Sequence, residues 1–200
     1  MPSLRDAQTA GAVLLLSLLT VSVPDVRAQP TPVPIDGDRS ALSYRGSHPL
    51  HDWIGTSRAV GGTLAIDLQD SSESRVEIDV PVASFDSGNG RRDARMRELV
   101  SADRHPSVRF VGSEVAVERW AATQRGYEGA WRVRRALTFN GRTHEVVVPV
   151  SVRVTGRVFE AAARFEISLD RFEVRRPRLL GIPIGDTLRL EGDVRATLGA

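Results

Sequence analysis

The sequence contains no cysteine among its 200 residues. This absence excludes disulfide bonds, thiolate ligands to zinc and a lipid-modified N-terminal cysteine. The chain must therefore draw its stability from an apolar core. A chain of this length forms one domain with room for such a core.

Lysine is also absent, so all 27 basic residues are arginines. The 25 acidic residues are interleaved with them and leave a net charge of +2. Two short basic clusters stand out, RVRR at 132–135 and RRPR at 175–178. Solvated strand faces or rims account for most clusters of this kind, and an anion site is the less frequent alternative. The charge pattern does not indicate a nucleic-acid partner.

The sequence lacks a hydrophobic run long enough for a transmembrane helix. The main apolar run covers residues 12–23, whereas a membrane span needs roughly 20 residues. Arg5 precedes the run, Pro24 ends it, and 26–28 (VRA) carries small or apolar residues at the −3 and −1 positions of a cleavage site. We interpret residues 1–28 as a signal peptide. The expected product is a periplasmic or secreted protein without a transmembrane anchor, beginning near Gln29.

From residue 36 onward, apolar and polar residues alternate. In 76–80 (VEIDV), for example, every second residue is Val or Ile, which is typical of a half-buried strand. Asn140-Gly141 lies between two such runs and predicts a two-residue hairpin turn. Residues 91–100 break the alternation and predict a short helix. The pattern predicts an all-β fold over 36–200, an antiparallel sandwich or barrel with one short helix.

Residues 29–35 carry prolines at every second position, 30, 32 and 34. Proline favours extended backbone and cannot donate a hydrogen bond to a strand ladder. We therefore expect these residues to form an extended leader outside the sheet.

Three stretches resemble one known family. They are VEIDVPVASFDSGNGRRDARMRELVSADRHPSVRF (76–110), LTFNGRTHEVVVPVSV (137–152), and FEISLDRFEV followed by GDTLRLEGDVRA (165–196). In order and spacing they are similar to the strands, the Arg-Asp helix and the central hairpin of the YceI-like family. That family comprises exported polyisoprenoid-binding proteins with a lipocalin-like barrel. The resemblance therefore implies a single antiparallel β-barrel of about eight strands.

The resemblance implies a lipid partner, a polyisoprenoid or another long-chain amphiphile inside the barrel, with no cofactor and no catalytic residues. A barrel of about eight strands either fills with side chains or holds one small ligand, so an interaction module with a full core stays open, as does a homodimer. The residues expected to line the lumen are Ile78, Val80, Phe85, Met96, Leu99, Phe110, Val146, Val148, Val150, Phe165, Ile167, Leu169, Leu188 and Leu190.

Two arginines depart from the family pattern. Arg95 stands where the family often has the histidine of Arg-Asp-x-His, so no role of that histidine transfers to this chain. Arg135 interrupts the apolar face of its strand. It either lies at the rim and contacts a polar headgroup, or marks a β-bulge that turns it outward.

Residues 47–57, SHPLHDWIGTS, look most like a catalytic or metal site. His48 and His51 are three apart, and Asp52 follows them. Pro49 breaks the helix that would place both histidines on one metal, and a zinc site needs three or four ligands. A barrel-rim turn is the preferred interpretation, with His48 and His51 as candidate headgroup contacts. A metal-dependent hydrolase built on His48, His51 and Asp52 is the alternative.

Overall fold

The structure, a computed structural model, describes residues 30–199. Its main element is one antiparallel sheet of ten strands. These are β1 (Val33–Pro34), β2 (Ala41–His48), β3 (His51–Ser57), β4 (Gly61–Ala65), β5 (Arg75–Pro81), β6 (Ser107–Thr123), β7 (Gly126–Phe139), β8 (Arg142–Thr155), β9 (Val158–Ser168) and β12 (Thr187–Thr197). A small hairpin pairs β10 (Arg178–Leu179) with β11 (Ile182–Pro183). The helices are α1 (Gly90–Leu99) and the 3-10 turns η1 (Gly37–Arg39), η2 (Ser71–Glu73) and η3 (Val82–Ser84).

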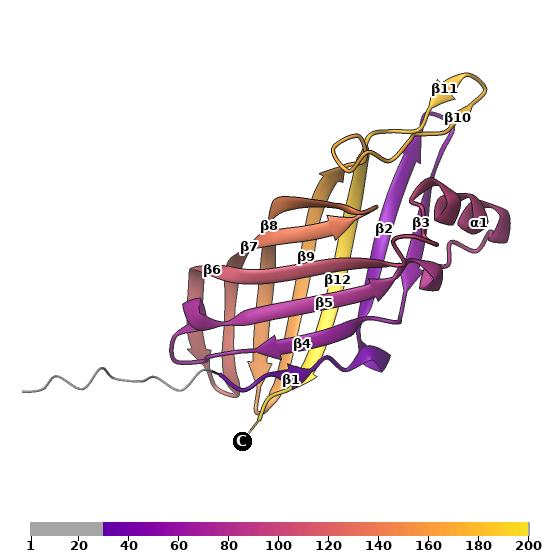
Figure 1. Cartoon of the computed structure of the whole chain (residues 1–200). Coiled ribbons are helices and arrows are strands. Elements are labelled where there is room, and N and C mark those ends of the chain that lie inside the picture. Colours follow the sequence, from indigo (N-terminus) through magenta and orange to yellow (C-terminus); the bar gives the residue numbers. More distant parts are fainter. Residues whose placement is uncertain (1–29, 200) are drawn as a thin grey trace, which may run out of the picture.

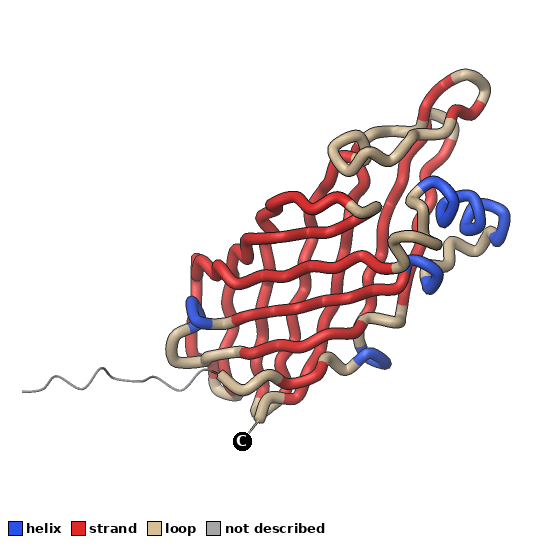
Figure 2. Tube along the Cα trace, viewed as in Figure 1, coloured by secondary structure: helices blue, strands red, loops and turns tan. Residues whose placement is uncertain are grey.

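The sheet curls into a half-barrel of two crossing layers (Figure 1). The strand order is β1-β4-β5-β6-β7-β8-β9-β12-β2-β3. Two isolated bridges extend the pairing at the edges, one between Ile35, which follows β1, and Ala196 of β12, and one between Thr56 of β3 and Asp86. Strands dominate the trace and α1 lies beside one end (Figure 2). The predicted all-β antiparallel fold with one short helix is confirmed.

Strand β6 carries the irregularities that help the sheet to curl. Its register with β7 shifts between Gly112 and Glu114 and again between Val117 and Arg119. A β-bulge bends its strand and increases the local twist. The longest strand can therefore follow the curved wall and stay paired with β7 along most of its length.

Local sequence signals set the turn and the helix start. Asn140 and Gly141 adopt φ angles of 49° and 70°, as a two-residue type I′ turn requires, so the predicted hairpin is confirmed. The Asn89 side chain accepts a hydrogen bond from the Arg92 backbone N–H at 3.1 Å. This N-cap satisfies an otherwise unpaired donor, and α1 begins at Gly90, one residue before the predicted helix.

The expectation for the leader, residues 29–35, needs correction. Val33 pairs with Leu64 of β4, and both Val33 and Ile35 are buried in the core. Pro34 is exposed on this edge strand, where a missing N–H is tolerated. The prolines therefore do not exclude a strand, and the sheet begins inside the predicted leader.

The strand number also exceeds the predicted eight. The added strands are the short β1 and the division of residues 41–57 into β2 and β3 by a turn at Pro49-Leu50. The predicted signal peptide, residues 1–28, lies outside the described residues. Within residues 30–199, no helix is long and apolar enough to cross a membrane.

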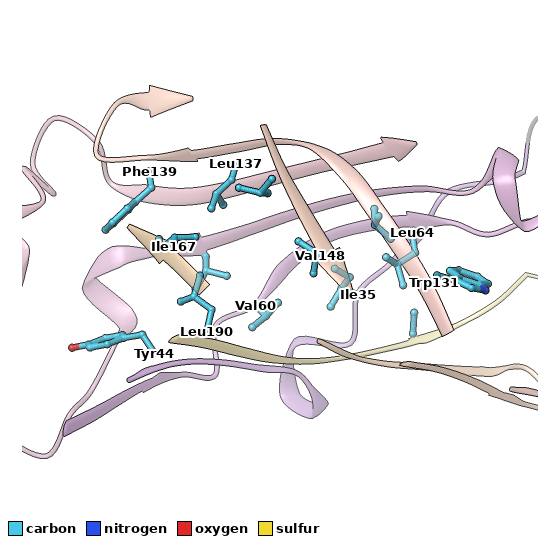
Figure 3. Close-up of a cluster of buried hydrophobic side chains, with 14 of the residues drawn as sticks. Ile35, Tyr44, Val60, Leu64, Trp131, Leu137, Phe139, Val148, Ile167 and Leu190 are labelled. Atoms are coloured by element: carbon cyan, nitrogen blue, oxygen red, sulfur yellow. The ribbon is translucent and has the colours of Figure 1, made fainter. Parts of the chain in front are cut away.

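The inner faces of the strands form one apolar cluster along the barrel (Figure 3). Leu64, Leu137, Val148 and Ile167 are among its buried members, each from a different strand. Their alternation with outward residues follows the period of two that strand geometry imposes. The cluster surrounds the space in which the candidate site lies.

Candidate functional site

The half-barrel contains a cavity of about 390 Å³. Close-packed interiors contain few voids larger than a water molecule, and a water occupies about 30 Å³ in the liquid. Small-molecule pockets have volumes of roughly 300–1,000 Å³. The cavity is therefore too large for a packing defect and matches the size of a ligand pocket.

The cavity wall is built from the inward positions of the strands together with one face of α1. Every residue that the sequence analysis expected in the lumen lies on this wall, with the exception of Val146. Met96 and Leu99 reach it from α1 and Phe85 from the segment after η3, while the others come from strands and their ends. The alternation that predicted the strands thus also predicted which side chains face the cavity.

Val146 is buried but does not reach the cavity surface. The turn after β9 packs against the start of β8, where the Arg171 side chain donates a hydrogen bond to the Glu145 carbonyl at 3.2 Å. Phe172 from this turn has no exposed surface, and its ring lies 5.8 Å from that of Phe139. We infer that this turn keeps Val146 away from the cavity surface. The alternation of residues within β8 does not reveal which other segment packs over the start of that strand.

Several aromatic residues of the wall were missing from the predicted lining, among them Trp131, Phe139 and Phe159. Two others are Tyr44 of β2 and Trp53 of β3. Each ring lies over a glycine of the facing strand. A Cβ atom added at Gly55 would be 2.4 Å from the Tyr44 ring, and one at Gly46 would be 2.4 Å from the Trp53 ring. The register pairs Tyr44 with Gly55 and Gly46 with Trp53. The sequence therefore contained a signal for these two wall residues, namely two Gly–aromatic pairs on either side of a short turn.

Burial raises the pKa of Tyr44, and the nearby Asp93 carboxylate raises the pKa further, against the opposing effect of Arg92. The hydroxyl therefore stays protonated and uncharged at neutral pH. Asp93 is itself buried in α1 and accepts hydrogen bonds from the Ser87 N–H and hydroxyl. The Arg92 side chain also donates to Ser87, at 2.9 Å to the hydroxyl and 2.7 Å to the carbonyl. These bonds fasten the start of α1 beside the cavity.

His48 lies on the cavity wall at the end of β2 and is 5% exposed. Its Nδ1 atom accepts a hydrogen bond from the Leu50 N–H at 3.3 Å, which places the proton of the neutral imidazole on Nε2. Nε2 is buried and has no hydrogen-bond partner among residues 30–199. An unpaired buried donor is unfavourable by about 1–3 kcal/mol, so this N–H is suited to an acceptor on a ligand.

His51 and Asp52 do not join His48 in a catalytic arrangement. His51 lines the cavity but is exposed, and the centroids of the two imidazole rings are 6.3 Å apart. Asp52 lies off the cavity wall and pairs with Arg45 at 3.9 Å. Within residues 30–199, no group of three or more His, Asp or Glu side chains could hold a metal ion.

Arg135 does not contact the cavity. It pairs with Gly112, where the register of β6 and β7 shifts before Glu114, and it donates a hydrogen bond to the Ser113 hydroxyl at 2.7 Å. Of the two interpretations of Arg135, the structure supports the β-bulge, and the candidate headgroup contact at this residue is corrected. A bulge locally reverses the inward–outward alternation of a strand. A prediction from a period of two alone therefore assigns Arg135 to the wrong face.

The described part of the cavity wall carries positive charge and no negative charge. Arg75, Arg92 and Arg95 line it, whereas no Asp or Glu among residues 30–199 does. Arg95 also pairs with Glu98 at 2.7 Å, and both side chains are more than half exposed. The wall can therefore accept a neutral or anionic polar group beside an apolar body.

The sequence profile of the YceI-like domain matches residues 34–196, nearly the whole of the described chain. The chain belongs to the YceI-like family.

Relatives of this YceI-like chain include two UPF0312 proteins. One from Photorhabdus laumondii is 25% identical over 152 residues, which are 74% of this chain and 71% of that protein. One from Serratia proteamaculans is 27% identical over 143 residues, which are 70% of this chain and 67% of that protein.

Two solved structures share the YceI-like architecture. BcnA of Burkholderia cenocepacia has a TM-score of 0.70 at 21% identity and covers 82% of this chain and 99% of its own. A polyisoprenoid-binding domain of Saccharophagus degradans has a TM-score of 0.64 at 12% identity and covers 83% and 98%. At these identities the likeness establishes the YceI-like fold.

Proposed function

We propose that this YceI-like protein is exported and holds a polyisoprenoid or similar long-chain amphiphile in its barrel, as a carrier or sequestering protein and not as an enzyme. The observation that carries the proposal is the apolar cavity of about 390 Å³, walled by the inward Val, Leu, Ile and Phe side chains. An apolar chain gains roughly 0.8 kcal/mol for each CH₂ group that leaves water. The likeness to a polyisoprenoid-binding domain supports this ligand class.

The polar end of the ligand would lie near His48 and α1. The Nε2–H of His48 is buried without an acceptor, and His51, Arg92 and Arg95 lie on the same cavity wall. Donors and cations favour an oxygen-bearing headgroup, such as a hydroxyl, carbonyl or phosphate. We place the tail along the strands and the headgroup at these residues.

Lipid occupancy tests the proposal, with Val148 and Val147 as a matched pair. Val148 lines the cavity and is 6% exposed, while its neighbour Val147 points outward and is 41% exposed. Val148→Trp places extra volume in the ligand space, so lipid recovered by organic extraction and mass spectrometry should fall severalfold. Val147→Trp should retain lipid at the wild-type ratio.

The same pair tests the rival interaction module with a full core. In a full core, Val148→Trp is overpacking and should lower the free energy of unfolding by about 1–3 kcal/mol. Wild-type protein without extractable lipid, together with a strongly destabilised Val148→Trp variant, would end the carrier proposal.

Export is tested separately by N-terminal sequencing of material from the periplasm or medium of a producing cell. The residues at 26–28 (VRA) and the apolar run at 12–23 predict a new N-terminus at or near Gln29. Recovery of the chain with Met1 intact in the membrane fraction would contradict export in soluble form.

A further inference from the structure

The β10–β11 hairpin projects beyond the barrel at the end where α1 lies (Figure 1). Its tip presents Leu179, Leu180 and Ile182 to solvent, with exposed fractions of 41%, 81% and 45%. Large apolar side chains that gather on a projecting element mark an interaction surface more often than isolated ones do. The hairpin therefore offers apolar side chains that the barrel itself leaves uncovered.

The turn at this tip is unfavourable for the residue it contains. Leu180 and Gly181 form a two-residue turn with φ angles of 52° and 82°. Such turns favour Asn, Asp or Gly, and a branched residue such as leucine is strained at positive φ. Both the backbone conformation and the exposure to water disfavour leucine, so neither explains its presence. A contact outside the chain would.

The charges around the hairpin complement an anionic surface. Arg175 and Arg178 are exposed, and neither pairs with a carboxylate among the described residues, since Arg178 donates to the Gly181 carbonyl at 3.0 Å. Each arginine near a membrane surface strengthens binding to anionic lipid by about fivefold. An apolar tip with unpaired arginines at its base is the pattern of an interfacial anchor.

The base of the hairpin is held firmly. Arg176 donates to both carboxylate oxygens of Asp170, at 2.8 Å and 2.9 Å, and to the Ile184 carbonyl at 2.9 Å. Asp186 accepts a hydrogen bond from the Asp170 N–H at 2.8 Å. Burial alone would raise the pKa of Asp186, but this bond, the Ser168 hydroxyl and Arg176 lower it. These interactions fix the base of the hairpin and therefore the position of its tip relative to the barrel.

The hairpin is continuous with the cavity. Leu179, although partly exposed, and Ile184 also line the cavity wall, whereas Leu180 and Ile182 face solvent alone. The β2–β3 turn lies against it, because the Gly185 N–H donates to the Ser47 carbonyl at 2.8 Å. That turn adds Leu50, which is 60% exposed. Apolar side chains thus continue from the cavity to the outer surface.

We propose that the tips of the β10–β11 hairpin and of the β2–β3 turn form a docking surface for an anionic phospholipid bilayer. Leu50, Leu180 and Ile182 enter the interface between headgroups and acyl chains, and Arg175 and Arg178 contact the phosphates. Docked in this way, the cavity wall at Leu179 adjoins the acyl region of the membrane. This inference goes beyond the proposed function, which requires a ligand in the cavity but no contact with a membrane.

The absence of cysteine makes a local test available. In the full chain, Leu180→Cys provides one attachment site for an environment-sensitive fluorophore, and Val117→Cys provides the control. Val117 is similarly apolar and 42% exposed, but lies on β6 away from the hairpin. Vesicles containing one third phosphatidylglycerol in phosphatidylcholine should shift the emission of the probe at position 180 to shorter wavelength. The probe at position 117 should not respond.

A second pair of variants tests the two components of the surface by vesicle co-sedimentation. Combined Arg175→Ser and Arg178→Ser should weaken binding to the anionic vesicles by about tenfold or more. Ile182→Asp, with its apolar contact replaced by a charge, should weaken binding by about tenfold or more. Val117→Asp should bind like the wild type. All variants share residues 1–29, so any contribution of that segment is equal.

Several outcomes would overturn the docking surface. They are an unchanged probe at position 180, equal shifts at 180 and 117, and binding that ignores loss of both arginines. A shift that appears without vesicles and grows with protein concentration would instead assign the surface to a second copy of the chain. Lipid extraction on the same samples separates the two proposals. Bound lipid without docking would contradict only the docking surface. Docking without bound lipid would contradict only the carrier role.

Discussion

The two ends of the barrel use apolar side chains in opposite ways. At the end that we call the aromatic end, Trp120 and Tyr127 stack with ring centroids 5.3 Å apart, and Trp131 lies 5.1 Å from Trp120. Trp131 is only 3% exposed. At the helix end, beside α1, Leu50 and Leu180 are 60% and 81% exposed. The aromatic end keeps its large rings buried or half-buried, whereas the helix end, which also buries Phe85 and Phe172, presents two leucines to solvent.

This difference indicates that the residues that stabilise the fold and the residues that serve its function lie at opposite ends of the barrel. Burial stabilises the folded state in proportion to the apolar area removed from water, so the aromatic end contributes to folding. Leucines exposed to water contribute almost nothing to the stability of the fold. The helix end thus carries features that folding alone does not account for, which is where a binding function is expected.

The largest expected effect is the loss of unfolding free energy caused by Trp131→Ala at the aromatic end. Trp131 packs against Trp120 and Phe159, and truncating a buried Trp is unfavourable by about 3–5 kcal/mol. Denaturant unfolding should record this loss. Leu180→Ala, at the helix end, should change the free energy of unfolding by less than about 0.5 kcal/mol. Equal losses for the two variants would show that stability is spread evenly over both ends.

His48→Leu should separate ligand binding from stability at the helix end. Leucine removes the buried donor that lacks a partner but also the acceptor of the Leu50 N–H bond, so the free energy of unfolding should change by no more than about 1 kcal/mol. Retained lipid should fall by up to about tenfold, the equivalent of one hydrogen bond to the headgroup. Quantitative extraction and thermal unfolding measure the two effects.

His144→Leu is the control for this variant, because His144 packs against Phe172 and does not line the cavity. It should leave lipid retention unchanged. A loss of stability in His48→Leu with unchanged lipid would show that His48 is only a framework residue.

The sequence was informative where a property is local. Alternation in β8 and β9 placed Val148, Val150 and Ile167 on the cavity wall, and Asn140-Gly141 predicted its turn. It failed where the outcome depends on partners distant in the chain. The edge strand at Val33 forms only because β4 is there to pair with it. The unpaired Nε2–H of His48 likewise emerges only from the folded arrangement.

The smallest effect that we predict concerns Leu180, where stability and docking should move in opposite directions. Leu180 adopts a φ of 52°, a conformation that is unfavourable by about 1–2 kcal/mol for most residues but that Asn adopts routinely. At 81% exposure it has little packing to lose. Leu180→Asn should therefore raise the free energy of unfolding by up to about 1 kcal/mol, measured by denaturant unfolding, while binding to anionic vesicles decreases.

Ile182→Asn is the matched control for this prediction. Ile182 lies in the same hairpin and is 45% exposed, but its φ is not positive. The substitution should weaken vesicle binding in the same way and bring no gain in stability, because no backbone strain is relieved there. If Leu180→Asn lost stability, or gained it while vesicle binding stayed intact, leucine at the tip would have no connection to a membrane contact. A gain in stability only at position 180, with binding lost at both positions, would assign the strain at Leu180 to docking.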